Sequence, residues 1–540
     1  MAVSTGDVST VQYVVVVVGL FLIYKILHIG MRPKNYPPGP PTIPIVGNLL
    51  QIPIKNFHLG FQEIAKKYGP IVSLKLGATD MIMLNHPTAV RELLEKRSNI
   101  YSARPDIYIR EYLDNYNILL RDNDDMWRRQ RKLYHARLNV KTTDTYLPYQ
   151  HFESVQFLHD LLYQPEEFLE HTRRFTASVS TTLIYGWRTP KIHDGWVKRL
   201  LEWFDATSDA INFQLVDFYP FLKPWYRIMP HWMSSYKRTL RRIRQLENAT
   251  FLPLLEEAKR RIQEGKHYPC FTADMLLDKD ADRLEDVQIA HNAGNGFGAA
   301  MDTTSNTLMG FIKAMALYPE VQAKGQKEID SVIGADKMPS WDDRARLPYI
   351  RAIVEETVRW APSPLTAAAP HSLLKDDVYN GMVIPKRSPF FQVWTLNHGT
   401  FAEPRQFRPE RFTDESTALE STAISPDSSK RPHFTFGGGR RVCPGFHVAE
   451  RALFIAISRM LWSFDIRRKY DSNGNPTPIE PDAVTPGFIV RPADFECDIK
   501  PRDAHRKDMI INAWKECEKE LDSEGNYTEE FFRRTFKKKF

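Results

Sequence analysis

The stretch FTFGGGRRVCPGFHVAE, residues 434 to 450, places one cysteine directly in front of a predicted helix. Pro444 suits the first turn of a helix, because proline lacks an N–H that this position leaves unused, and a long, mostly apolar run follows it. Cys443 is therefore expected at a helix N-terminus, where free N–H groups and the helix dipole favour a thiolate. The glycines before it allow the backbone to pass close to a large, flat group.

The other three cysteines, Cys270, Cys497 and Cys517, are distant in the sequence. No C-x-x-C pair and no cysteine and histidine cluster with zinc spacing is present, which disfavours a closed zinc site. Four cysteines in 540 residues without paired spacings also argue against a disulfide framework and suit a reducing compartment. An isolated cysteine is most often buried and inert, and spacing alone leaves that alternative open.

The order F-x-x-G-x-R-x-C-x-G resembles the heme-thiolate loop of the cytochrome P-450 family; Phe436, Gly439, Arg441, Cys443 and Gly445 carry it. The resemblance implies heme b, iron protoporphyrin IX, with Cys443 as the axial ligand of its iron and Phe436 among the heme-contacting residues. Such a thiolate pushes electron density toward bound oxygen and favours O–O cleavage.

The rest of the sequence predicts a mainly α fold with a small β region. Helical periodicity prevails, and strand patterns are short. Residues 71–85, IVSLKL-GATD-MIMLN, predict a hairpin, and DDVYNGMVIP contains an Asn380-Gly381 turn typical of tight hairpins. This agrees with what the resemblance implies, a cytochrome P-450 fold behind an N-terminal transmembrane helix.

Residues 13–24, YVVVVVGLFLIY, carry no charge, and the apolar segment approaches the ~20 residues that a spanning helix needs. No basic region precedes it and no A-x-A-like cleavage site follows, which favours an uncleaved anchor over a signal peptide. Basic residues follow the segment while Asp7 precedes it. By the positive-inside rule, we expect a single-pass protein of the endoplasmic reticulum membrane with a cytosolic catalytic domain.

We expect one large domain behind this anchor. The stretch PPGPP predicts a stiff spacer, and the formal net charge of +7 suits a membrane surface or an acidic protein partner. No nucleic-acid motif is visible, so no nucleic-acid partner is expected. The predicted parts are a membrane anchor (1–30), a basic and proline-rich linker (31–41), a heme-thiolate monooxygenase domain (42–500) and a charged C-terminal extension (501–540).

The run GNGFGAAMDTTSNTL, residues 294–308, has three alternate glycines, each of which weakens a helix by about 1 kcal/mol relative to alanine. They predict close approach of another element. A threonine within a helix usually bonds the carbonyl one turn back, and Thr303 has that alternative. AAMDTT resembles the family's oxygen-binding motif A/G-G-x-D/E-T, with Ala300 where glycine is usual. The resemblance implies that Asp302 and Thr303 deliver protons to the distal oxygen.

DMWRRQRKLYH places Trp127 and Arg131 at i and i+4, so that both face one partner. A solvated basic face is the alternative for such a run. The W-x-x-x-R pattern resembles the family helix that binds the heme propionates. Arg441 and His371 match further propionate-contacting positions.

EETVRW contains Glu356 and Arg359 at i and i+3, a spacing that by itself usually marks a surface ion pair. Together with Arg411 of FRPERF they match the family's buried structural triad. We therefore assign these three residues to folding around the heme and not to chemistry.

The resemblance implies a monooxygenase that inserts one atom of O2 into a small molecule by hydroxylation or a related oxidation. APSPLTAAAP (361–370) and the tyrosines Tyr108, Tyr112 and Tyr116 match regions lining the substrate pocket, which suggests an apolar or aromatic substrate. Electrons would come from NADPH through a separate NADPH-cytochrome P-450 reductase, since no Rossmann or flavin fingerprint is evident. PHSLLKDDVYNGMVIPK looks most like fungal enzymes of secondary-metabolite biosynthesis.

Two other functions remain to be separated from this one. An oxygen-independent heme-thiolate isomerase or dehydratase would not need Asp302 and Thr303. A non-catalytic heme-binding gas sensor would need neither that pair nor a surface for a reductase.

The C-terminal extension has apolar residues near helical spacing from Met509 to Leu521 and ends in FFRRTFKKKF. A solvated, partly disordered tail is one expectation. The other is a second membrane contact, with phenylalanines such as Phe531 and Phe532 entering the lipid interface beside basic residues that meet anionic lipid.

Overall fold

The computed structural model describes the chain in two compact units. The described residues are 5–52, 56–113, 116–193, 195–211, 213–266, 268–277, 284–365, 369–388, 390–392, 399–413, 431, 433–487 and 489–536, with backbone alone for 5–11, 390–392 and 536. Unit 1 combines residues 1–108, 213–230 and 370–400, and unit 2 combines 109–212, 231–369 and 401–540.

Unit 1 is built on a three-stranded sheet. β1 (Ile71–Leu76) pairs antiparallel with β2 (Thr79–Leu84), and β2 pairs parallel with β5 (Phe390–Gln392). All six residues of β1 are buried, and α2 (Phe57–Tyr68) packs against this strand. The hairpin predicted within residues 71–85 is confirmed.

The second predicted hairpin is also confirmed. β3 (Asp377–Tyr379) pairs antiparallel with β4 (Met382–Ile384) across the Asn380-Gly381 turn. Both turn residues have positive φ, +51° and +77°. This is the backbone of the tight turn whose twist matches that of the flanking strands.

The short helices of unit 1 surround these strands. They are η1 (Leu49–Gln51), α3 (Pro87–Val90), the π-helix η2 (Arg91–Lys96), α10 (Leu215–Phe218), η4 (Pro220–Leu222) and α11 (Lys223–Ile228).

The proline-rich segment is held against the sheet. The Ser73 N–H donates to the Pro38 carbonyl at 2.8 Å, and Arg32 donates to the Gly39 carbonyl at 2.9 Å. A Cβ on Gly39 would lie 2.1 Å from the Ser73 carbonyl oxygen, so the approach requires glycine. The segment predicted as a spacer therefore packs on β1 as part of unit 1.

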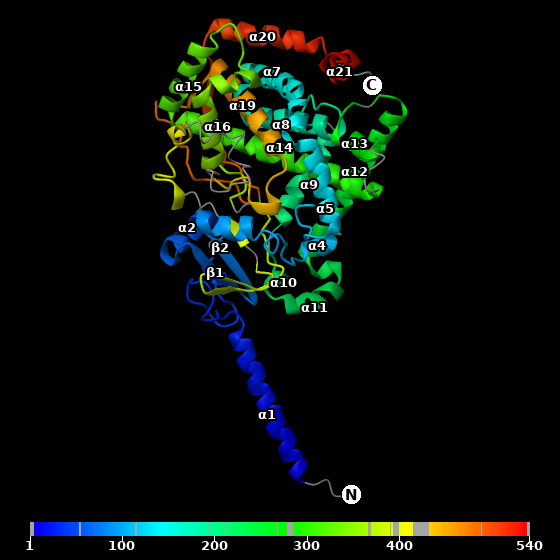
Figure 1. Ribbon diagram of the computed structural model, residues 1–540, viewed down its shortest axis with the longest axis vertical. Helices are drawn as coiled ribbons and strands as arrows, with labels where there is room; N and C mark the ends of the chain where they lie inside the picture. Colours follow the sequence, from blue (N-terminus) through cyan, green and yellow to red (C-terminus); the bar gives the residue numbers. More distant parts are fainter. Residues whose placement is uncertain are drawn as a thin grey trace. The chain divides into compact units, whose positions relative to one another are not determined.

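The N-terminal segment forms α1 (Thr5–His28), the blue helix of Figure 1. Its large apolar side chains between Tyr13 and Leu27 are 48–74% exposed. Within the described residues, however, no helix combines the length and the apolar character that crossing a bilayer requires. The structure thus gives the predicted transmembrane helix no support.

Unit 2 is mainly helical, and α14 (Asp286–Leu317) runs through its core. α14 packs against α8 (Phe168–Tyr185), α12 (Ser235–Gln263), α16 (Pro348–Trp360) and α19 (Phe446–Ser463), as Figure 1 shows. Almost every residue of α14 from Ile289 to Ala316 is buried. The mainly α fold with small sheets is confirmed.

The alternate glycines of α14 allow the close packing that the sequence predicts. A Cβ on Gly294 would lie 2.3 Å from the Phe251 ring, and one on Gly298 would lie 2.6 Å from the Phe204 ring. These separations are far below van der Waals contact, so α14 approaches its neighbours only because these positions lack a side chain.

The remaining elements of unit 2 complete the helical bundle and one two-stranded sheet. They are α4 (Ile109–Tyr112), α5 (Asp125–Leu138), α6 (Val140–Asp144), α7 (Leu147–Tyr163), η3 (Pro165–Glu167), α9 (Gly195–Ala210), η5 (His231–Met233), α13 (Phe271–Leu277), α15 (Pro319–Val332), η6 (Trp341–Arg346), η7 (Pro409–Phe412), η10 (Gly439–Arg441), β6 (Phe464–Arg468), β7 (Cys497–Pro501), α20 (Ala504–Glu518) and α21 (Glu529–Phe536).

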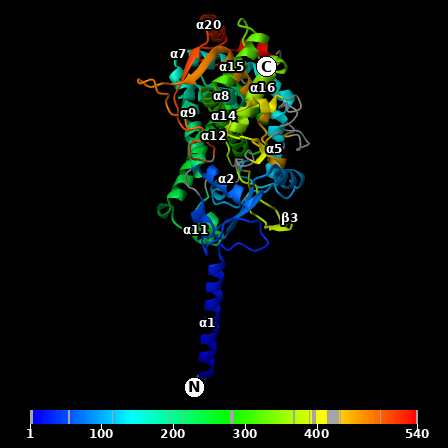
Figure 2. The ribbon, with the colours of Figure 1, turned by 90° about the vertical axis from the view of Figure 1, so that its left-hand side faces the viewer.

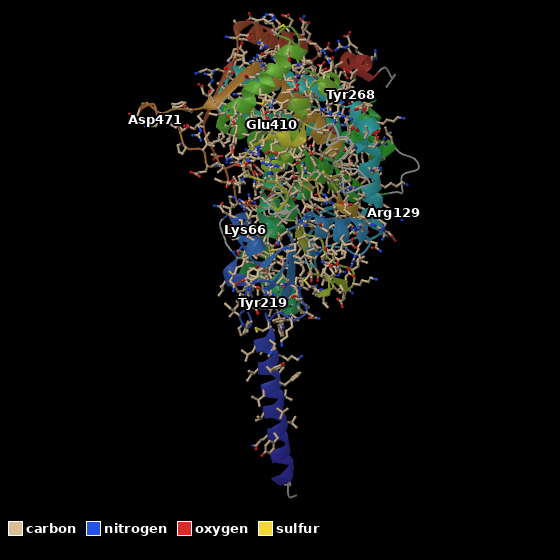
Figure 3. All side chains as sticks on the ribbon, turned by 60° about the vertical axis from the view of Figure 1, so that its left-hand side comes forward. Lys66, Arg129, Tyr219, Tyr268, Glu410 and Asp471 are labelled. Carbon is tan, nitrogen blue, oxygen red and sulfur yellow. The ribbon has the colours of Figure 1, made fainter. Side chains whose placement is uncertain are left out.

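The C-terminal extension is folded, which corrects both expectations for its described part. α20 packs along α7, and the two lie together in Figures 1 and 2. Phe531 and Phe532 are only 4% and 1% exposed. Phe532 stacks on Tyr268, labelled in Figure 3, with ring centroids 3.4 Å apart. These two phenylalanines belong to the core of unit 2 and are not available to a membrane.

A buried carboxylate ties the extension to the bundle. Glu153 of α7 contacts Arg174 at 2.5 Å and Arg188 at 2.6 Å, and the Tyr527 hydroxyl donates to it at 2.9 Å. Burial opposes ionisation of Glu153, but the two guanidinium groups lower its pKa to about 2. Arg188 also donates to the Gly525 carbonyl, so the extension shares in the same network.

We expect Tyr527→Phe to destabilise the protein by about 1.5–3 kcal/mol, because it removes a hydrogen bond to a buried charged group. The midpoint of thermal unfolding measures the effect. Tyr470→Phe is the matched control, since Tyr470 is 60% exposed. Equal midpoints for the two variants would show that the hydroxyl does not hold the extension.

Candidate active site

Cys443 lies in a tight loop between Phe434 and α19. The Gly437 N–H donates to the Phe434 carbonyl and the Cys443 N–H donates to the Phe436 carbonyl, each at 2.9 Å. Gly437 and Gly439 have φ of +81° and +62°, a region that residues with a side chain rarely adopt. Gly437 and Gly439 are therefore required by the backbone path of this loop.

The sulfur of Cys443 is at the N-terminal end of α19, as predicted. Burial raises the pKa of the Cys443 thiol, whereas the N–H groups of Gly445 and Phe446 and the charge of Arg131 act to lower it. The Cys443 residue keeps part of its surface exposed. A sulfur that faces N–H donors and a cation suits a thiolate that binds a metal ion.

Three of the predicted heme-binding residues meet beside this loop. Arg131 of α5 donates to the Val442 carbonyl, next to Cys443. The Arg441 guanidinium lies 4.0 Å from the centre of the Trp127 ring and donates to the Arg121 carbonyl at 2.9 Å. The contact of Arg441 with the indole face is a cation–π interaction that orients both side chains.

Phe436 and His371 occupy different units. The Phe436 ring packs edge-on against Phe446 of α19, with centroids 4.7 Å apart. His371 belongs to unit 1, where it is buried and its Nδ1 lies 3.0 Å from the Tyr101 carbonyl oxygen. Phe436 is therefore part of the cysteine loop. His371 lies in unit 1, and its contacts are described within that unit.

Thr303 makes the hydrogen bond that is usual for a threonine within a helix. Its hydroxyl donates to the Ala299 carbonyl one turn back at 2.8 Å. Ala299 is exposed and Ala300 and Thr303 are partly exposed, although the helix around them is buried. α14 thus presents a short accessible stripe of small side chains and one hydroxyl.

Asp302 is 9% exposed and has a cationic neighbour. Its carboxylate lies 3.3 Å from Arg173 of α8, and Asn306 donates to it at 3.4 Å. Arg173 also lies 3.5 Å from Asp205 of α9, whose side chain is 58% exposed. Arg173 was not predicted as a site residue, because it is distant in the chain and belongs to no motif.

The three residues of the predicted structural triad lie together. Arg359 donates twice to Glu356, at 2.6 and 2.7 Å, and both side chains are at most 1% exposed. Arg411 lies 3.6 Å from the same carboxylate. The Arg408 N–H, which the sequence did not single out, also donates to Glu356 at 2.7 Å.

The residues of unit 2 fit the heme that the resemblance implies. The loop offers a sulfur that faces the N–H groups of Gly445 and Phe446. Arg131 and Arg441 supply cations of the kind that bind carboxylates such as heme propionates. The small side chains of the α14 stripe leave room for a flat group.

The regions expected to line a substrate pocket are only partly described. Tyr108 is buried in unit 1 against Tyr226, with ring centroids 4.7 Å apart. Tyr116 of unit 2 packs on His291 of α14 at 5.2 Å. Tyr112 of α4 contacts His231. Residues 366–368 of the APSPLTAAAP segment lie outside the described residues.

Comparisons with known proteins agree with this arrangement. A family model described as cytochrome P450 matches residues 37–496. Among curated proteins, the cytochrome P450 monooxygenase virE of Hypocrea virens is 38% identical over 514 residues, covering 94% of this chain and 92% of virE. The monooxygenase fogE of Aspergillus ruber is 37% identical over 514 residues, covering 93% and 94%.

A solved structure shows the same fold. A zebra fish cytochrome P450 with progesterone aligns with a TM-score of 0.66 at 22% identity, covering 82% of this chain and 99% of that chain.

Proposed function

Because the chain belongs to the cytochrome P450 family, we propose that it is a heme-thiolate monooxygenase acting on an apolar or aromatic small molecule. One atom of O2 enters the substrate by hydroxylation or a related oxidation. The observation that carries the proposal is Cys443, which faces the N–H groups of Gly445 and Phe446 at the start of α19, beside the Arg131 cation.

In the proposed site, Cys443 would bind the heme iron through its sulfur, and Trp127, Arg131 and Arg441 would hold the propionates. Heme b, when bound, supplies the iron chemistry that activates O2. The N–H groups directed at the sulfur stabilise its negative charge and limit its protonation. Arg131, which also contacts the loop carbonyl of Val442, couples propionate binding to the position of the thiolate.

Proton delivery is assigned to Asp302 and Thr303. The Thr303 hydroxyl lies on the accessible stripe, so it can turn from the Ala299 carbonyl toward a ligand. Asp302 is buried but reaches Arg173, and Arg173 reaches the exposed Asp205. In this scheme Arg173 holds Asp302 on the side of α14 that leads to the exposed Asp205. The Asp302 carboxylate can then exchange protons with solvent.

The metabolic pathway and the electron donor are proposed from the relatives and the sequence. The curated relatives compared above are fungal monooxygenases, which supports a role in a fungal secondary-metabolite pathway. Electrons are proposed to come from NADPH through a separate reductase. The basic exposed positions of α5, such as Arg129 in Figure 3, fit an acidic protein partner.

We further propose that the protein works at the endoplasmic reticulum membrane, with its catalytic part in the cytosol. Support comes from α1, which has apolar side chains around its whole circumference. A helix that is apolar on all sides is stable only when another apolar phase covers it. α1 is therefore the proposed attachment to the membrane.

The first test is the ferrous carbon monoxide spectrum. We expect the purified wild type to show the red-shifted Soret band of a thiolate-ligated heme, and Cys443→Ala to lose that band or the heme. An imidazole-like spectrum of folded wild-type protein contradicts the assignment of Cys443.

Turnover with reductase and NADPH separates the remaining alternatives. A monooxygenase couples NADPH consumption to oxygenated product. An isomerase or dehydratase forms product without NADPH, and a gas sensor binds carbon monoxide without forming product.

We expect Thr303→Ala to uncouple the enzyme, so that NADPH is consumed and hydrogen peroxide is released in place of product. The reason is the loss of the hydroxyl that directs proton delivery, a kind of step typically worth about 10²–10⁴-fold. Thr307→Ala is the matched control, because Thr307 makes the same bond one turn back, to the Thr303 carbonyl at 2.9 Å. The measurement is the amount of product formed per NADPH consumed. If this ratio is unchanged in Thr303→Ala, proton delivery depends on groups other than Thr303.

Deletion of residues 1–30 should move the protein from the microsomal pellet to the supernatant. The removed segment contains the exposed apolar side chains of α1, which provide the proposed attachment. Sedimentation of microsomes followed by immunoblotting measures the bound fraction. Equal binding by the full chain and the deletion variant would place the attachment elsewhere.

A further inference from the structure

α16 presents two consecutive buried glutamates, and only the second belongs to the predicted triad. The Glu356 carboxylate accepts hydrogen bonds from the Arg359 side chain and from the Arg408 N–H. Glu355 contacts a different residue, His433. The Nε2 atom of His433 lies 3.1 Å from Oε1 of Glu355, and both side chains are at most 2% exposed. His433 lies ten positions before Cys443 in the sequence, at the start of the segment that forms the cysteine loop.

Among the described residues, the Glu355 carboxylate and His433 Nε2 have only each other as polar partners. The two groups are in contact but are not aligned as a hydrogen bond, and within the described chain neither Glu355 oxygen nor His433 Nε2 makes a hydrogen bond elsewhere. A buried carboxylate without a partner is costly, and so is a buried ring N–H. Loss of either group therefore leaves the other uncompensated.

The backbone fixes the tautomer of His433. The Thr435 N–H donates to His433 Nδ1 at 3.2 Å. Nδ1 must carry the lone pair that accepts this bond, so the ring proton resides on Nε2, the atom that faces Glu355. The ring thus accepts the Thr435 N–H through Nδ1, and its protonated Nε2 lies in charge contact with the carboxylate on the other side.

These contacts continue to the sulfur through the backbone. Thr435 immediately precedes Phe436, whose carbonyl accepts the Cys443 N–H at 2.9 Å. The His433 ring also packs against the Phe436 ring, with centroids 6.5 Å apart, and edge-on against Phe412 at 6.4 Å. The side chain of His433 therefore contacts the backbone N–H of Thr435 and the ring of Phe436, both in the loop that holds Cys443.

We propose that His433 and Glu355 are a buried positioning pair for the cysteine loop. Glu355 orients the imidazole, His433 accepts the Thr435 N–H, and this holds Phe436 where its carbonyl receives the Cys443 N–H. The pair acts on the thiolate through the loop and does not touch the reacting atoms. This inference rests on the proposed role of Cys443 as the heme ligand.

Stability alone gives no reason for polar groups at these two positions. Replacing a buried polar pair with apolar side chains of similar volume is often neutral or stabilising. Phe412 and Phe436 already flank His433, and an aromatic ring there would extend the same packing. What an apolar ring cannot supply is the acceptor for Thr435.

The test uses the full-length heme protein and four variants. His433→Phe keeps a ring but removes the Nδ1 acceptor, and His433→Asn restores an acceptor near the Nδ1 position. Glu355→Gln keeps the size of the side chain but removes its charge. His171→Phe is the matched control, because His171 is also buried but bonds to Gln164, on another segment of unit 2.

Two readouts are followed: hydrogen exchange of the Thr435 and Cys443 amides, and the rate at which the ferrous carbon monoxide complex loses its thiolate-type Soret band. In His433→Phe we expect both to become about fivefold faster, the effect of losing one hydrogen bond. Glu355→Gln should shift both in the same direction, His433→Asn should restore them, and His171→Phe should change neither.

Unchanged exchange and unchanged band loss in His433→Phe would overturn the proposal. The proposal would also be overturned if His433→Phe raised amide hydrogen exchange throughout unit 2 and His433→Asn did not restore it. That result would show that His433 contributes to packing only. If the wild type lacks a thiolate-type band, the assignment of Cys443 fails instead. The exchange of Thr435 and Cys443 still measures the pair in that case.

Discussion

The organisation of unit 2 depends on the buried carboxylate of Glu356. It receives two hydrogen bonds from Arg359 and one from the Arg408 N–H, while Arg359 also donates to the Pro404 carbonyl. These contacts fix the segment around η7 on α16, and that segment leads along the chain toward the cysteine loop. Burying an ion pair contributes little net stability, because desolvation offsets the attraction, but it allows only one arrangement of the partners. The triad therefore specifies a geometry more than it stabilises a fold.

The same principle recurs at Glu153. Arg174 of α8 and Arg188, just after that helix, converge on this carboxylate, and Tyr527 brings the C-terminal extension to it. α7, which carries Glu153, also contacts α19 through the hydrogen bond from Gln150 to the Val448 carbonyl. The extension beyond residue 500 is thus connected, through one helix, to the helix that begins beside Cys443. A segment outside the family model has become part of the support of the site.

Short sequence patterns correctly predicted the features that depend on residues close together in the chain. The hairpins at 71–85 and at Asn380-Gly381, the helix that begins after Cys443 and the close packing at the α14 glycines all follow from backbone preferences within a few residues. Burial of Phe531 and Phe532 could not be predicted, because FFRRTF reads the same whether its phenylalanines meet lipid or the aromatic rings of α7. Arg173 and the Glu355–His433 contact were missed for a related reason: each joins elements far apart in the sequence, and neither pair has a fixed spacing.

The two groups assigned to proton delivery are both satisfied within the protein. Thr303 donates to the Ala299 carbonyl, and Asp302 is held by Arg173 and Asn306. A hydroxyl bonded to a carbonyl that already accepts a helical hydrogen bond is released at a small net cost, about 1 kcal/mol. Releasing Asp302 costs more, since a carboxylate at 9% exposure loses its counter-ion. Thr303 is therefore the group that responds first to a ligand beside α14, and Asp302 can follow only if Arg173 moves with it or water replaces the contact.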